Sequence, residues 1–190
     1  PDWHGDCRDF KKLGKPRLFF GISPGCMDSM VNKYTARKRL RSEDAYSPDG
    51  RHDCRPEYPT IVYTKILKQL FPDVPVVLGG IEASLRRLTH YDYWQDKLMP
   101  SILLSSGADI ITYGMGEKAS IALCETSPDQ WHTIPQTVYI ADSVAPAEGD
   151  IVLHSHEECM KDRRCQAENF RHIEEESNKV HVSRLIQQAE

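Results

Sequence analysis

The chain has 190 residues, of which 39% are hydrophobic and 27% charged, and its formal net charge is −4. This length suffices for one domain with an apolar core plus an appendage, and the mildly acidic charge gives no general reason to expect nucleic acid or an anionic membrane as a partner. No apolar run approaches the roughly 20 residues that cross a bilayer, and no signal-peptide pattern opens the chain, so we expect a cytoplasmic protein without membrane contact.

Apolar runs and amphipathic stretches alternate along the first part of the chain, which is typical of an α/β fold. We expect strands at 18–22, 74–78 and 108–113 and an outer strand at 137–140. Between them we expect helices from 29 to about 41, at 61–71, at 102–107 and at 118–125. Asp28 or Ser29 can cap the first helix. Residues 42–58 are rich in polar residues, Pro and Gly, so we expect a long loop that is either functional or disordered.

The chain changes character after these elements. Residues 141–150 contain three acidic residues, one proline, one glycine and no large apolar run, and we interpret them as a linker. A short strand follows at 151–153, and the highly charged remainder predicts one or two surface helices with a break near Ser177. We therefore expect a domain at 1–150 and a helical extension at 151–190 that leads toward a further domain.

The stretch at 74–84 organises the predicted site. Its strand shows no polar alternation, as when both faces of a strand are covered, and Gly79 and Gly80 allow a tight turn where it ends. The predicted strands at 18–22 and 108–113 also carry glycine at or near their ends. Parallel strands would bring all three loops to the carboxyl edge of one sheet, where ligands bind in such folds. The candidate ligand-facing residues are Gly79, Gly80, Glu82, Ser84, Gly114, Gly116 and Glu117.

The glycine pair carries a prediction of its own. We expect at least one of Gly79 and Gly80 to adopt a backbone conformation that a residue with a Cβ resists. A rival explanation is that the aromatic stretch from Tyr91 to Trp94 packs closely on this loop, which would also demand glycine.

Charged and aromatic side chains crowd the segment that follows. Arg86, Arg87, His90 and Tyr91 form either a partly buried packing cluster or a surface for substrate or for another domain. A second cationic group, Arg37 to Arg41, is either a solvated helix end or, together with Arg86 and Arg87, a contact for phosphate or RNA.

The six cysteines do not predict a metal centre. No C-x2-C pair occurs, and no spacing matches a zinc site or an iron–sulfur run. We interpret them as reduced thiols, the alternative being adventitious metal capture by Cys159 and Cys165 with His154 and His156. No nucleophile, base and orienting group form a recognisable set, so we predict neither catalytic nor metal-binding residues, and a stand-alone enzyme is disfavoured.

Three motifs stand out, namely Gly79-Gly-Ile-Glu-Ala-Ser-Leu-Arg-Arg87, His90-Tyr-Asp-Tyr-Trp94 and Ala108-Asp-Ile-Ile-Thr-Tyr-Gly114. Together with residues 32–40, 44–48 and 175–181, they resemble the amino-terminal region of the YgiQ family of radical-SAM proteins. Two of them also resemble the cobalamin-binding-like domains that precede many radical-SAM barrels. The resemblance implies a Rossmann-like fold of flavodoxin or cobalamin-binding type, with a mostly parallel sheet flanked by helices.

The chain departs from this family in two respects. It lacks the C-x3-C-x2-C cluster motif of the family's downstream barrel, and it lacks the D-x-H-x-x-G motif of base-off cobalamin domains. We therefore expect a segment of a longer protein, with a sheet that is incomplete on its N-terminal side and no cofactor in the segment itself. The resemblance implies a [4Fe-4S] cluster and S-adenosylmethionine in the full-length protein, and it leaves cobalamin open.

The expected function follows from this resemblance. We expect an accessory domain of a radical-SAM iron-sulfur enzyme of unknown substrate, which covers the barrel or positions substrate or cofactor. Its expected partners are its own downstream barrel and a small-molecule or nucleotide-like ligand. The alternative is a module that binds RNA or phosphate without catalysis of its own, which the net charge does not support.

Overall fold

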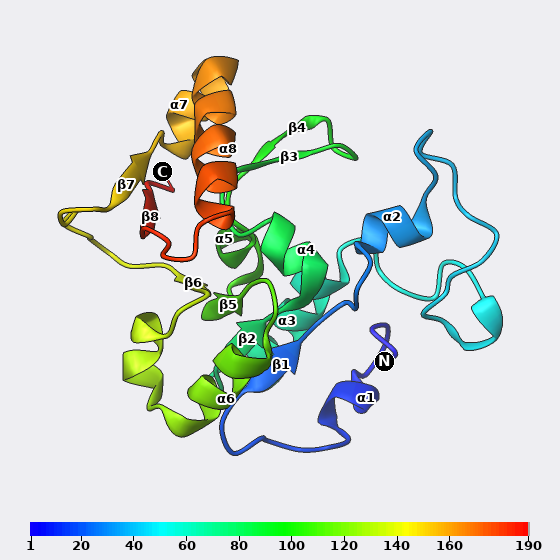
Figure 1. The fold of residues 1–190 in the computed structure, drawn as a ribbon. Coiled ribbons are helices and arrows are strands. Elements are labelled where there is room, and N and C mark those ends of the chain that lie inside the picture. Colours follow the sequence, from blue (N-terminus) through cyan, green and yellow to red (C-terminus); the bar gives the residue numbers. More distant parts are fainter. Residues whose placement is uncertain (190) are drawn as a thin grey trace. The chain divides into compact units, whose positions relative to one another are not determined.

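A computed structural model describes residues 1–189, whose course can be followed by colour from the N-terminus in Figure 1. These residues form two compact units. The first unit comprises residues 1–87 and 102–140. The second comprises residues 88–101 together with the chain from Ala141 onward. Within residues 1–189, no helix has the length and apolar character needed to cross a bilayer.

The first unit is built on a four-stranded sheet. Its strands, in spatial order, are β1 (Phe20–Ile22), β2 (Val76–Leu78), β5 (Ile110–Thr112) and β6 (Thr137–Tyr139). β1 pairs with β2 and β2 with β5 in parallel, whereas β5 and β6 are antiparallel. The predicted α/β fold, with a mostly parallel sheet and an outer strand at its end, is therefore confirmed.

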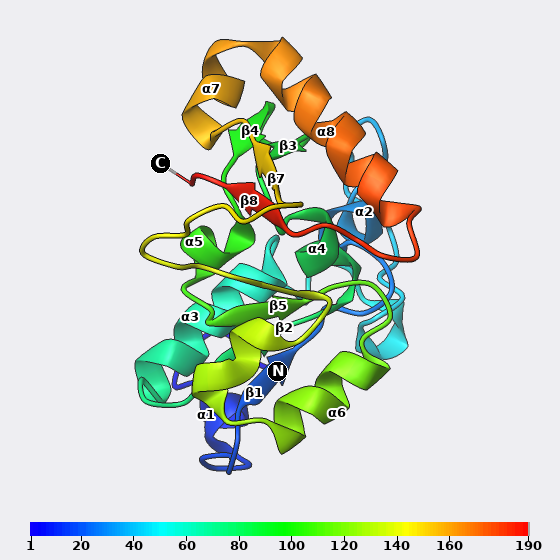
Figure 2. The same ribbon diagram turned by 60° about the vertical axis from the view of Figure 1, so that its left-hand side comes forward.

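Helices cover both faces of this sheet. The helices of this unit are, in chain order, α1 (Arg8–Lys11), α2 (Ser29–Lys33), η1 (Pro48–Gly50), α3 (Pro59–Leu70), α4 (Gly80–Leu85), α5 (Ile102–Ser106), α6 (Glu117–Glu125) and η2 (Pro128–Thr133). Val76, Leu78 and Ile111 pack with α3 and α5 on one face, and Val77 and Ile110 pack with α6 and η2 on the other. In Figure 2 the strands accordingly lie between α3 and α6. An unbroken apolar run such as β2 needs this double cover, because successive side chains of a strand point to opposite faces.

The helix after β1 is shorter than the sequence predicts. It ends before Tyr34, not near Arg41, and Tyr34 is extended and forms an antiparallel bridge with Leu40. The Thr35 amide closes the turn between them by donating to the Arg39 carbonyl over 2.8 Å, and the Thr35 hydroxyl accepts the Arg39 amide over 3.2 Å. A hydroxyl that binds nearby backbone competes with helix formation, which is the physical reason for the early end.

The long loop at 42–58 is ordered around the buried side chain of Asp44. Its carboxylate accepts hydrogen bonds from four groups: Asn32 Nδ2 (2.5 Å), Tyr46 N (2.8 Å), Ser47 Oγ (2.9 Å) and Arg55 Nε (3.2 Å). Burial alone would raise the pKa of Asp44, but these hydrogen bonds outweigh burial and hold the pKa below its usual value. These contacts give residues 42–58 a defined conformation around Asp44.

The second unit contains one local and one long-range strand pair. β3 (His90–Asp92) and β4 (Lys97–Met99) form an antiparallel hairpin, and β7 (Ile151–Leu153) and β8 (Leu185–Gln187) form a parallel pair. Between β7 and β8 the chain forms α7 (His156–Lys161) and α8 (Arg163–Ser177). The strand at 151–153 and two helices after it are confirmed. The break between the two helices lies at Asp162, whereas at Ser177 the helical part ends and the chain continues to β8. The sequence pattern does not predict β3, β4 and β8, because β3 and β4 contain charged and polar residues and β8 follows a highly charged segment, so no apolar run marks them.

Removal of the Asp44 carboxylate should destabilise the protein. Asp44→Ala leaves buried donors of Asn32 and Arg55 without their acceptor, which we expect to lower the free energy of unfolding by about 3 kcal/mol. Denaturant titration measures this loss. Glu43→Ala, at the exposed neighbouring position, is the control and should cost less than about 0.5 kcal/mol.

The same substitution should have a defined pH dependence. The pKa of an Asp side chain in the unfolded chain is near 4, and the native pKa of Asp44 is lower. The Asp44 carboxylate therefore stabilises the native state fully above about pH 4, and this stabilisation is lost as the pH falls through the native pKa. The difference between wild type and Asp44→Ala should therefore be full at pH 7 and shrink below about pH 4. A difference that stays constant from neutral pH into strong acid would contradict this assignment.

Candidate functional site

Three loops meet at the carboxyl edge of the parallel strands in the first unit. The loops after β1 and β2 touch, because a Cβ built on Gly80 would lie 2.6 Å from Ser23 Oγ and 3.1 Å from the Gly25 carbonyl oxygen. The loops after β2 and β5 also touch, since Ser84 Oγ accepts a hydrogen bond from the Gly114 amide over 3.3 Å. The prediction that the three loops share one edge of a parallel sheet is confirmed.

Gly80 is the member of the glycine pair whose backbone requires glycine. Its φ is +79°, whereas Gly79 is extended with φ at −148°. The nearest atoms to a Cβ on Gly80 belong to Ser23, Pro24 and Gly25, so the rival explanation of aromatic packing is wrong. Gly80 also begins α4, so the loop after β2 is shorter than expected and consists of Gly79 alone.

The inner face of α4 is charged. Glu82 is 1% exposed, and its Oε2 accepts the amide of Ser29 over 3.3 Å. Arg86 is 8% exposed and forms an ion pair with Asp28, which also accepts the amide of Met30 at the start of α2 over 3.0 Å. These contacts tie α2 to α4. Glu82 and Arg86 therefore support the edge from inside, and their contact with a ligand or partner stays a prediction.

The other candidates lie toward the outer side of this edge. Ser84 and Gly116 are half-buried, and Gly114 and Glu117 are exposed. Gly114 has a φ of +72°, which shapes the turn after β5. A Cβ on Gly116 would lie 3.9 Å from Ser120 Oγ and 4.0 Å from Thr112 Oγ1, so a methyl group fits there in ordinary contact. The four residues offer a hydroxyl, a carboxylate and accessible backbone.

Thr112 belongs to this edge, although the sequence pattern does not single it out. Its hydroxyl donates to the Leu78 carbonyl over 3.3 Å and thereby joins β5 to β2. It is also the nearest atom to a Cβ on Gly79, at 3.4 Å. The sequence feature that could have identified Thr112 is its place at the end of a predicted strand, just before a glycine-bearing loop.

The predicted surface of four residues is divided between the two units, with Arg86 and Arg87 in the first and His90 and Tyr91 in the second. Arg87 donates to the Ser84 carbonyl over 2.6 Å, and its guanidinium lies 4.9 Å from the centre of the Tyr113 ring. Tyr91 lies on β3, where its hydroxyl donates to Asp96, and this hydrogen bond raises the pKa of Tyr91. Each pair of residues therefore has its own structural setting.

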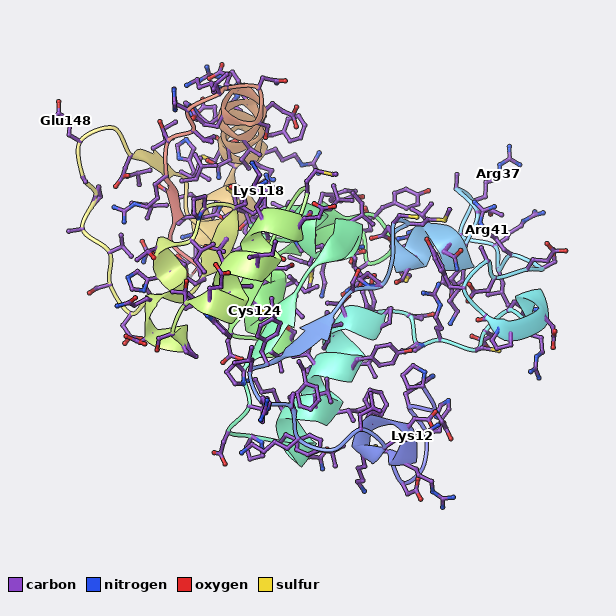
Figure 3. All side chains as sticks on the ribbon, turned by 60° about the horizontal axis from the view of Figure 1, so that its bottom comes forward. Lys12, Arg37, Arg41, Lys118, Cys124 and Glu148 are labelled. Carbon is purple, nitrogen blue, oxygen red and sulfur yellow. The ribbon has the colours of Figure 1, made fainter. Side chains whose placement is uncertain are left out.

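The alternative phosphate site loses two of its cations, because Arg86 and Arg87 are engaged within the first unit. The remaining group, Arg37 to Arg41, lies on the turn after α2, where Figure 3 shows Arg37 pointing away from the ribbon. Arg41 Nε instead donates to the carbonyls of Val31 and Tyr34, each over 3.0 Å. The structure therefore does not favour an RNA-binding surface built from both groups.

No three His, Cys, Asp or Glu side chains within residues 1–189 are placed to hold a metal ion. All six cysteines are free thiols. Cys159 is buried, and burial raises the pKa of its thiol, which disfavours the thiolate that a metal binds. His154 Nε2 lies 2.7 Å from Glu168 Oε2. The alternative of adventitious metal capture therefore finds no geometric support.

A cavity of about 250 Å³ opens at the opposite, amino-terminal edge of the sheet. Its lining residues are Pro75, Asp109, Ile110, Pro128, Trp131, His132 and Tyr139. Asp109 already accepts hydrogen bonds from Lys68 Nζ and the Val76 amide, both over 2.6 Å. None of the candidate residues lines this cavity, so we keep the carboxyl edge as the candidate site.

Substitution of Gly80 should be costly because of both its conformation and its crowding. Gly107 has a similar φ of +75° but no atom within 4 Å of a built Cβ, so Gly107→Ala isolates the conformational cost of roughly 1–2 kcal/mol. Denaturant titration should show a larger loss in the free energy of unfolding for Gly80→Ala than for Gly107→Ala. The loss for Gly79→Ala should be smaller than either. Equal costs at Gly80 and Gly107 would show that the contact with Ser23 is irrelevant.

The two neighbouring arginines should differ sharply in their effect on stability. Arg86→Met strands the buried carboxylate of Asp28, and we expect a loss of about 3–5 kcal/mol in the free energy of unfolding. Arg87→Met removes a half-buried guanidinium from Tyr113 and should cost no more than about 1 kcal/mol. Thermal and denaturant unfolding of both variants provide the comparison. Similar losses would refute the different roles assigned to them.

Comparison with known proteins agrees with the motifs and the fold. A UPF0313 protein of Bacteroides thetaiotaomicron is 60% identical over 100% of this chain, which covers 34% of that protein. UPF0313 proteins of Porphyromonas gingivalis and Geobacter sulfurreducens are 60% and 45% identical over 98% of the chain, which covers 31% and 32% of them. The chain thus spans about a third of the length of these relatives. No solved structure matches it. The family described as Radical SAM N-terminal matches residues 1–190, and the chain belongs to this family.

Proposed function

We propose that this chain is the accessory N-terminal region of a radical-SAM enzyme, and that its carboxyl edge positions a small-molecule or nucleotide-like ligand for chemistry performed elsewhere in the full-length protein. The observation that carries the proposal is the meeting of three loops at one edge of a parallel sheet, in a chain of the Radical SAM N-terminal family. Open parallel sheets bind ligands at this edge, where strands give way to loops and helix starts.

The residues at this edge are suited to positioning a ligand. Gly114 and Gly116 have no side chain, so a ligand can approach the backbone closely. Ser84 offers a hydroxyl, and Glu117 offers an exposed carboxylate at the start of α6. The buried charges of α4 hold the edge in place, and a site on a rigid support is more precise than one on a mobile loop.

In this proposal the [4Fe-4S] cluster and S-adenosylmethionine are held by the rest of the polypeptide. Cluster ligands are cysteine thiolates that converge on one small core. No metal-binding set exists within residues 1–189, so the residues present do not fit a cluster. We assign no cobalamin ligand. The free thiols suit a reducing compartment, and we propose the cytoplasm as the location.

The test uses the full-length protein, reconstituted anaerobically with iron and sulfide. We expect the wild type to show cluster absorption and an electron paramagnetic resonance signal after reduction, and to cleave S-adenosylmethionine reductively. Gly116→Leu should retain the cluster and the unfolding midpoint, because a Cβ has room there. Its cleavage rate should fall about tenfold, since the new side chain enters the proposed ligand space.

Cys124→Leu is the matched control, because Cys124 is exposed on the same helix but at its other end, as Figure 3 shows. It should leave the cleavage rate unchanged. A full-length protein that takes up no cluster would refute the radical-SAM assignment. Equal rates for Gly116→Leu and the wild type would refute the role of the carboxyl edge.

A further inference from the structure

α4 is inverted relative to an ordinary surface helix. Its buried face carries Glu82 and Arg86 beside the small core residue Ala83, whereas its exposed face carries Ile81, which is 37% exposed, and Leu85, which is 58% exposed. A surface helix normally turns apolar side chains to the core and charges to water. Ile81 and Leu85 are four positions apart, so they lie on the same side of the helix.

The loop after β5 adds a third apolar side chain to this region. Met115 is 74% exposed and follows Gly114, whose amide donates to Ser84 Oγ on α4. Ser84 lies between Ile81 and Leu85 in the helix. Single exposed apolar side chains are common, but a group of them beside a functional edge is typical of an interaction site.

The inversion of α4 is held in place by buried polar contacts. Arg86 pairs with Asp28, and Glu82 accepts the amide of Ser29, so the charged face is bound to α2. Turning the apolar face inward would expose a buried ion pair and break these contacts. Ile81 and Leu85 are therefore held outward, and a surface other than that of α2 is needed to cover them. Removing apolar surface from water is favourable in proportion to the area covered.

We propose that Ile81, Leu85 and Met115 form a docking face for the remaining part of the same full-length polypeptide. The inference rests on the proposed function, in which this region serves a catalytic domain outside it. The chain covers 34% of its Bacteroides relative, so most of such a protein is available in cis to cover the face. A contact in cis needs no concentration-dependent association, because the two surfaces are already linked.

The test measures peroxide oxidation of methionines in the full-length protein by peptide mass spectrometry. Met160, which is 57% exposed in the second unit, serves as the internal reference. We expect Met115 to be oxidised at least about tenfold more slowly than Met160, because docking removes it from solvent. Leu85→Lys should abolish this protection, and Leu85→Ser replaces it if the lysine variant does not fold. Ile121→Lys, at a position 59% exposed on α6, should leave the protection intact.

The possible outcomes separate the docking face from the proposed function. Fast oxidation of Met115 in the wild type, or protection that Leu85→Lys and Leu85→Ser leave unchanged, would overturn the docking face. If Met115 is protected from oxidation only at protein concentrations at which sedimentation shows a dimer, the face is covered by a second copy, and docking in cis is overturned. Iron and sulfide analysis of the same wild-type preparation tests the radical-SAM proposal separately, because a protein without a cluster can still protect Met115.

Discussion

The candidate site depends on one buried ion pair, between Asp28 and Arg86. Asp28 also caps α2, and the Arg86 carbonyl accepts the amide of Ile102 at the start of α5 over 2.8 Å. Burying two charges costs desolvation energy, which is recovered only with good geometry and additional hydrogen bonds. We infer that the pair serves mainly to place the helices around the carboxyl edge in one arrangement.

This polar interior explains why the edge has both a rigid base and an apolar exterior. With Glu82 and Arg86 committed to α2, the side chains that α4 presents outward are Ile81 and Leu85. Gly80 at the start of α4 and Gly114 in the loop after β5 both have left-handed backbone conformations. The Ser84 hydroxyl connects them, because it donates to the Gly80 carbonyl and accepts the Gly114 amide. The result is an edge whose backbone is accessible and whose neighbouring helix presents apolar side chains, as the proposed docking face requires. Both features suit a region that spans about a third of its relatives.

The sheet could be predicted because its strands depend on local pattern. An apolar run without alternation, as at residues 74–78, has few stable settings other than a strand covered on both faces. The end of α2 could not be predicted, because the Thr35 hydroxyl and the bridge from Tyr34 to Leu40 outweigh helix propensity. The strands β3 and β4 form a hairpin of charged and polar residues, and β8 pairs with β7 across more than thirty residues, so no local apolar run marks any of the three.

The sequence by itself determined the fold class, the edge where the three loops meet, the need for glycine near residue 80 and the family. Each depends on neighbours in the chain or on a recognisable motif. Only the tertiary structure decided that Glu82 and Arg86 point inward and that His90 and Tyr91 belong to another unit. The physical reason is that a charge can be buried only where a partner meets it. For Arg86 that partner is Asp28, which lies 58 positions earlier in the chain and whose approach no local pattern records.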